Sequence, residues 1–146
     1  MFAARKELPA LGRLIVNMRN PRFLLAFSSI LLLVGGIAHA AAFNRALAVI
    51  AASNLPPFIG NSFKALWLAD SATQVILAVL FGLVAARPSR ATRSMVALPA
   101  LIPATTAVLI YTFLGGFYAG HLLLVAAAAA FFAGLQFPGA RVQGSG

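Results

Sequence analysis

The sequence contains no cysteine and few charged residues. Without cysteine, a disulfide framework, a thiolate nucleophile and a thiolate metal site are all excluded. Only 9% of the 146 residues are charged, whereas a soluble domain carries about 25%. Acidic residues are the scarcest class, because Asp and Glu together number 2 against 11 Lys and Arg. The composition therefore argues against a soluble globular domain.

Recognised catalytic signatures are also missing. The sequence has no glycine-rich phosphate loop, no H-E-x-x-H and no G-x-S-x-G. No reaction class follows from motifs, and whether the protein is an enzyme stays open at this point. No local spacing of ligands indicates a metal site either.

Long apolar runs are what the sequence does have, since 62% of its residues are hydrophobic. A helix that spans the hydrocarbon core of a membrane needs about 20 mostly apolar residues. Runs of this length predict four spans at residues 23–43, 63–86, 95–114 and 117–137. The runs are continuous rather than alternating, so they predict helices and not barrel strands. We expect an all-α, integral membrane four-helix bundle over residues 22–138.

The basic residues alternate with the apolar runs. Nine of them cluster before the first run, between the second and third, or after the fourth: Arg5, Lys6, Arg13, Arg19, Arg22, Arg87, Arg90, Arg93 and Arg141. Only Arg45 and Lys64 lie elsewhere. By the positive-inside rule this pattern predicts a multi-pass membrane protein with both termini cytoplasmic, including the tail at residues 139–146. Anionic membrane lipids account for the basic surface, so no nucleic-acid partner is expected.

A short amphipathic segment precedes the first span. Pro9 suits the first turn of a helix, and Leu11, Leu14, Ile15 and Met18 then recur at the spacing of one helical face. The pattern predicts an N-terminal interfacial helix within residues 1–21, lying on the cytoplasmic leaflet.

Three titratable residues fall inside the predicted spans, namely His39, Asp70 and His121. Ionisable groups there face the bundle interior or a wet cavity and are functional candidates by default. His39 lies about four residues before the outer end of its span, and His121 about four residues after the start of its own, so both are roughly 6 Å inside the outer boundary. Asp70 lies roughly 9 Å inside. The three are therefore predicted to share one layer of the outer leaflet.

Neighbouring polar and aromatic residues extend this candidate site. Gln74 follows Asp70 by one helical turn and shares its face, while Tyr111 and Trp67 are expected at a similar depth and are predicted ligand contacts. An Asp–His pair can move protons. Two histidines and a carboxylate could hold a divalent metal, and two histidines could ligate haem. A purely structural role, in which these groups bond neighbouring helices, stays open as well.

The sequence resembles the DoxX-like group of small four-helix bacterial membrane proteins over roughly residues 22–137. The resemblance is carried by Gly35-Gly36, the outer segment Asn54-Leu55-Pro56-Pro57, the stretch from Leu66 to Ser71, and Gly115-Gly116-Phe117-Tyr118-Ala119-Gly120-His121. It implies a bundle in the inner membrane and a link to quinone-coupled oxidation of small molecules or to redox complexes. Thiol chemistry, however, is excluded by the absence of cysteine.

Two functions remain in view. The first is a small-molecule or quinone- or lipid-like ligand site, redox- or proton-linked, in which His39, Asp70 and His121 do the chemistry. The second is a non-catalytic accessory subunit of a larger membrane complex, such as a respiratory or photosynthetic one, suggested by the small size and the small-residue helix faces.

Overall fold

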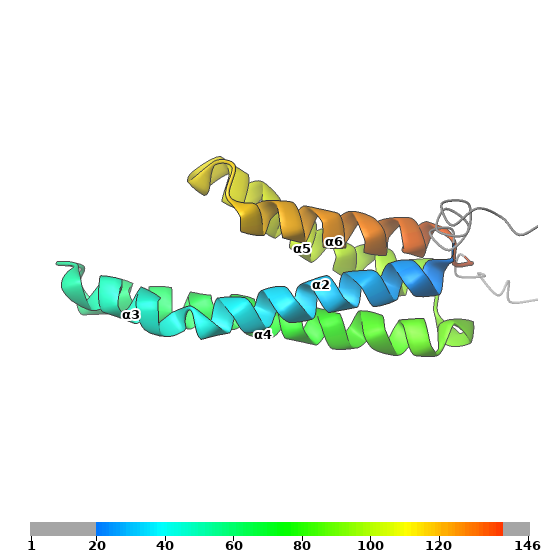
Figure 1. The fold of residues 1–146 in the computed structure, drawn as a ribbon, viewed down its shortest axis with the longest axis horizontal. Helices are drawn as coiled ribbons and strands as arrows, with labels where there is room; N and C mark the ends of the chain where they lie inside the picture. Colours follow the sequence, from blue (N-terminus) through cyan, green and yellow to red (C-terminus); the bar gives the residue numbers. More distant parts are fainter. Residues whose placement is uncertain (1–19, 139–146) are drawn as a thin grey trace, which may run out of the picture.

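The computed structural model describes residues 20–138, and these are helical throughout apart from short connections (Figure 1). The helices are α2 (Pro21–Ala41), α3 (Phe43–Ala52), α4 (Pro57–Ala86), the short 3-10 helix η1 (Pro88–Arg90), α5 (Arg93–Leu114) and α6 (Tyr118–Leu135). Within residues 20–138, four helical segments are long and apolar enough to cross a membrane, with α2 and α3 counted as one. The predicted all-α bundle of four membrane-length helices is confirmed. The predicted interfacial helix lies almost entirely outside the described residues, as does the tail at 139–146.

Local chemistry sets the ends of the helices. The side chain of Asn20 accepts a hydrogen bond from the backbone of Arg22 at 3.0 Å, and Pro21 occupies the first turn of α2. Pro57 begins α4 in the same way. Gly115 ends α5 with a φ of 68°, a conformation that favours glycine, and so allows the tight turn into α6.

The predicted spans leave residues 44–62 as a connection between them. In the structure α3 fills the first half of this connection and the start of α4 fills the second. The segment Pro21–Ala52 runs over 32 residues, which is about 48 Å of helix against a hydrocarbon core of about 30 Å. We call residues 43–63 the projecting hairpin, because in Figure 1 they extend beyond the α5–α6 turn.

The helices pack as two antiparallel pairs. α2 lies along α4, α5 lies along α6, and α2 also packs on α6, whereas α4 and α5 scarcely touch. Small residues form the seam: the hydroxyl of buried Ser28 donates to the Ala126 carbonyl of α6 at 2.8 Å, and Ser29 donates to the Ala78 carbonyl of α4 at 2.6 Å. The alanines of α6 are mostly buried, so its small-residue face packs inside this chain.

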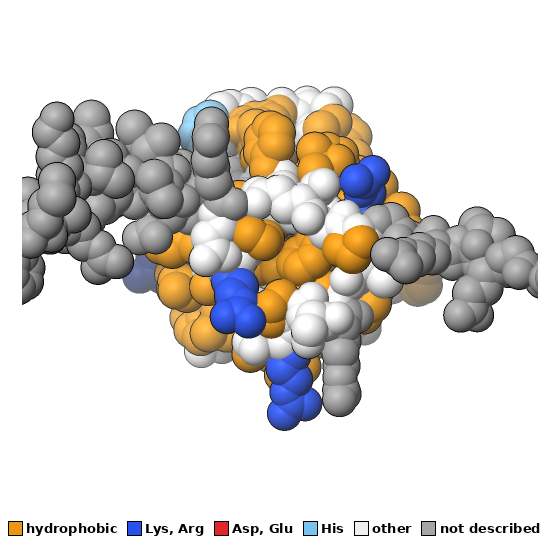
Figure 2. Space-filling view, turned by 90° about the vertical axis from the view of Figure 1, so that its right-hand side faces the viewer, with side chains coloured by type: hydrophobic (Ala, Val, Ile, Leu, Met, Phe, Trp, Pro, Cys, Tyr) orange, Lys and Arg blue, Asp and Glu red, His pale blue; other side chains and the backbone are white. Residues whose placement is uncertain are grey.

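The two ends of the bundle differ in charge. We call the end where α2 and α5 begin and α4 and α6 finish the basic end. It carries the exposed residues Arg22, Arg87 and Arg93, and Figure 2 looks onto it, with blue side chains around an apolar surface. At the opposite end, called the far end, the α2–α4 and α5–α6 pairs diverge (Figure 1).

Candidate functional site

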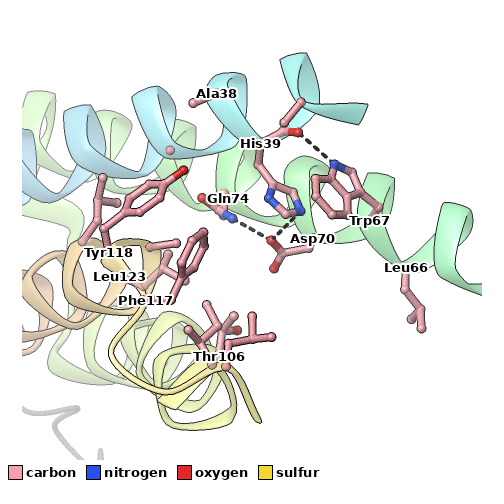
Figure 3. A pocket seen from close by; sticks show the side chains of 16 residues that line it. Ala38, His39, Leu66, Trp67, Asp70, Gln74, Thr106, Phe117, Tyr118 and Leu123 are labelled. Atoms are coloured by element: carbon pink, nitrogen blue, oxygen red, sulfur yellow. Dashed lines mark hydrogen bonds and ion pairs between the residues drawn. The ribbon is translucent and has the colours of Figure 1, made fainter. Parts of the chain in front are cut away.

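A cavity of about 490 Å³ lies where the two helix pairs diverge (Figure 3). α2 and α4 form one wall, and α5, the α5–α6 turn and α6 form the other. Most of the lining is apolar. Its polar side chains come from four positions: His39, Asp70, Gln74 and Thr106, with the ring systems of Trp67, Phe117 and Tyr118 beside them.

Trp67 holds His39 in place from two directions. The indole Nε1 donates a hydrogen bond to the His39 carbonyl oxygen at 2.8 Å. The imidazole and indole rings also stack, with centroids 4.2 Å apart and planes within 9° of each other. The orientation of the imidazole is therefore set by α4, although the residue belongs to α2.

Asp70 is the acceptor at the centre of the polar group. Its Oδ2 accepts a hydrogen bond from Gln74 Nε2 at 2.7 Å, one turn further along α4, as the spacing predicted. The same oxygen lies 3.6 Å from His39 Nε2. The side chains of His39 and Asp70 are 30% and 33% exposed, so both can be reached from the cavity.

The Gly35-Gly36 pair lets α2 approach α4 closely at this level. A Cβ on Gly36 would lie 3.1 Å from the Ser71 carbonyl and 3.0 Å from a Val75 methyl. A Cβ on Gly35 would lie 2.8 Å from Gln74 Oε1. The two glycines thus make room for the polar group, because larger residues would push it away from α2.

The cavity wall formed by α5, the α5–α6 turn and α6 carries aromatic rings. Phe117 and Tyr118 lie at the start of α6 with ring centroids 4.4 Å apart and planes tilted by 50°. Figure 3 shows these rings across the cavity from His39 and Trp67. Neither residue was among the site residues predicted from the sequence, which named them only in the stretch that carries the family resemblance. The signal was present in the stretch Phe117-Tyr118 directly after the Gly-Gly turn, which brings aromatic rings to the depth of His39.

His121 does not join His39 and Asp70. Its Nδ1 lies 2.6 Å from the Tyr111 hydroxyl, with the rings 5.4 Å apart, and neither residue lines the cavity. The predicted depth did not fix the direction of the side chain around α6. Residues 20–138 contain no group of three His, Asp or Glu side chains that could hold a metal. A metal or haem held by both histidines, one of the alternatives that the sequence left open, would therefore have no shared cavity in the described structure.

Among the other predicted ligand contacts, Trp67 and Gln74 line the cavity and Tyr111 does not. Tyr111 instead packs beside Gly120, where a Cβ would lie 3.1 Å from its ring. The polar group therefore consists of His39, Asp70 and Gln74, oriented by Trp67.

No protein-family model, curated protein or solved structure matches this chain. The resemblance to the DoxX-like group stays a prediction. The function has to be argued from the cavity itself.

Proposed function

We propose that this protein binds a small amphiphilic molecule, quinone- or lipid-like, in the cavity between its two helix pairs. One observation carries the proposal: a carboxylate, an imidazole and an amide gather at one place in an otherwise apolar cavity. Ligand sites typically combine apolar walls with a few convergent polar groups, in volumes of about 300–1,000 Å³. The cavity of about 490 Å³ is within that range.

The location of the cavity supports a ligand that reaches it from the membrane. Asp70 lies 17 residues from Arg87 on the same helix, or ~25 Å along its axis. With the basic end at the cytoplasmic boundary of a core of about 30 Å, the cavity opens within the outer leaflet. We accordingly propose the bacterial inner membrane as the location, with both termini cytoplasmic.

The chemistry of the polar group suits a ligand that exchanges protons. Asp70 and His39 lie 3.6 Å apart, and such a pair can accept a proton from a bound hydroxyl or return it. Their role would be proton transfer to the ligand, with Gln74 and Trp67 holding them in position. Membership in the DoxX-like group is part of the same proposal, supported by the glycine pair and the aromatic turn that form this cavity.

The proposal is tested by ligand titration with Trp67 as the reporter. Trp67 is the only tryptophan of the chain and lines the cavity, so its fluorescence reports occupancy directly. Protein in lipid nanodiscs is titrated with decylubiquinone and with triphenylphosphine oxide. We expect a saturable change in emission for at least one of these probes.

A cavity-filling variant supplies the control. Ala38→Phe places a ring in the cavity from α2 and is expected to abolish the saturable response. Ala26→Phe adds the same ring at an exposed position of α2 away from the cavity and should leave the response intact. A response equal in both variants, or none with either probe in the unmodified protein, would contradict the proposed function.

The projecting hairpin favours a second candidate, an accessory subunit of a larger membrane complex. Phe58 and Val49 are 79% and 71% exposed there, and Phe63 is 51% exposed. Exposed apolar side chains beyond the span of the shorter helix pair are typical of contact surfaces. Purification in mild detergent tests this candidate: a partner that co-purifies with the unmodified chain and is lost in Phe58→Ser supports it, whereas a stable lone chain argues against it.

A further inference from the structure

The aromatic rings of the cavity surround a single carboxylate. Trp67 and His39 face the cavity from one wall, and Phe117 and Tyr118 from the other (Figure 3). Aromatic faces carry negative electrostatic potential and attract cations that come within about 6 Å of the ring centroid. Two ring pairs on opposite walls can therefore contact a bulky cation from both sides.

The charge of the lining has one sign. No Lys or Arg is among the described residues that line the cavity. With histidine counted as neutral, Asp70 gives the lining a formal charge of −1. The nearest cation along α4, Lys64, is a half-buried residue outside the cavity, whose Nζ bonds the Asn61 side chain at 3.3 Å. An anionic ligand would therefore meet an unfavourable lining.

The carboxylate retains capacity for a ligand. Oδ2 already accepts from Gln74 Nε2 at 2.7 Å, while no residue in the described range 20–138 donates a hydrogen bond to Oδ1. A carboxylate has about four lone-pair sites, so Asp70 can pair with a ligand without giving up Gln74. With His39 neutral, 3.6 Å from Oδ2, the carboxylate has no positive partner among the described residues that line the cavity, and a cationic ligand supplies one.

We infer that the ligand of this cavity is a lipophilic organic cation, such as a protonated tertiary amine, paired with Asp70 between the two aromatic walls. The inference rests on the proposed function and narrows its ligand class from amphiphiles in general to cationic ones. Asp70 supplies the charge recognition, and Trp67, Phe117 and Tyr118 supply the aromatic contacts. A neutral ligand of the same shape would contact the same two walls but would lack the ionic interaction with Asp70.

Two probes of nearly the same shape and different charge test the inference. Methyltriphenylphosphonium and triphenylphosphine oxide are titrated into the full chain in nanodiscs, with Trp67 emission as the readout and protein-free discs to correct for partitioning. We expect the cation to bind roughly tenfold or more tightly than the neutral probe. In Asp70→Asn the ratio of the two affinities should fall several-fold, because the charge recognition is lost while the aromatic contacts remain.

Further variants keep the test decisive. Asp70→Glu keeps the carboxylate and should retain a preference for the cation. Lys64→Gln removes a charge from the same helix outside the cavity and should leave the ratio unchanged. Phe117→Leu should lower the ratio several-fold, because one aromatic contact is lost. Equal binding of both probes, unchanged by Asp70→Asn, would overturn the inference and leave the proposed function standing. Absence of a saturable response to either probe would overturn the inference, and absence of a response to decylubiquinone as well would overturn both.

Discussion

Replacing Gly36 with alanine tests whether the glycine pair sets the distance between α2 and α4. The added Cβ would lie 3.0 Å from a Val75 methyl, 3.1 Å from the Gln74 Cβ and 3.1 Å from the Ser71 carbonyl oxygen. These separations are shorter than ordinary van der Waals contact. Two of the three atoms belong to the backbone or its first side-chain carbon, so rotation of a side chain cannot remove the conflict and the helices must move apart.

The expected change in stability is a difference of two effects. Overpacking in a packed interior costs about 1–3 kcal/mol. Alanine is about 1 kcal/mol more favourable than glycine within a helix, which offsets part of that cost. The net result for Gly36→Ala is a loss of about 1 kcal/mol in the free energy of unfolding, or roughly a fivefold change in the equilibrium constant.

Equilibrium unfolding by sodium dodecyl sulfate in mixed micelles, followed by Trp67 emission and by circular dichroism, measures this change. Gly116→Ala is the matched control, because nothing lies within 4 Å of the added Cβ and its backbone is not in the glycine-favouring region. The control should remain within ~0.5 kcal/mol of the unmodified chain. The reasoning is refuted if Gly36→Ala proves as stable as Gly116→Ala.

Two further substitutions probe contacts of the same helices. In Gly35→Ala the new Cβ would lie 2.8 Å from Gln74 Oε1. The Gln74 amide should therefore turn away and lose its hydrogen bond to Asp70. The lost hydrogen bond and the gain in helix propensity are each about 1 kcal/mol, so their effects on the free energy of unfolding nearly cancel. Trp67 lines the same cavity as Gln74, so its emission should shift. The free energy of unfolding should stay within ~1 kcal/mol of that of the unmodified chain. Unchanged emission would count against this prediction. Ser28→Ala removes a buried hydrogen bond from α2 to a carbonyl of α6 and should cost about 0.6 kcal/mol and at most about 1.7; Ser62→Ala, which loses only a bond within its own helix, should cost less.

The sequence was sufficient to predict that His39 and Asp70 lie at one level of the bundle. His39 and Asp70 come within 3.6 Å of each other, as the rise per residue along two antiparallel helices predicted. The same reasoning placed His121 in this group, and there it did not hold, because depth is independent of direction around the helix axis. A neighbouring hydroxyl, that of Tyr111, pairs with His121 instead.

The extent of α4 shows a different limit. Hydrophobicity placed its start near Phe63, whereas the helix begins at Pro57. The intervening Asn61 and Ser62 are polar, and a search for apolar runs excludes such residues whatever their backbone does. The helical start signal at Pro57 was present in the sequence, because proline suits the first turn of a helix, but a search for apolar runs does not use it.

The sparse contact between α4 and α5 has a consequence for how tightly any ligand is observed to bind. The cavity is lined on that side by Leu66 and Leu114, which are 66% and 65% exposed, so the gap between these helices is not sealed by packing. A hydrophobic molecule dissolved in the acyl chains can then enter sideways. Its effective concentration is the amount per volume of lipid, which means that apparent dissociation constants should scale with the lipid-to-protein ratio of the sample.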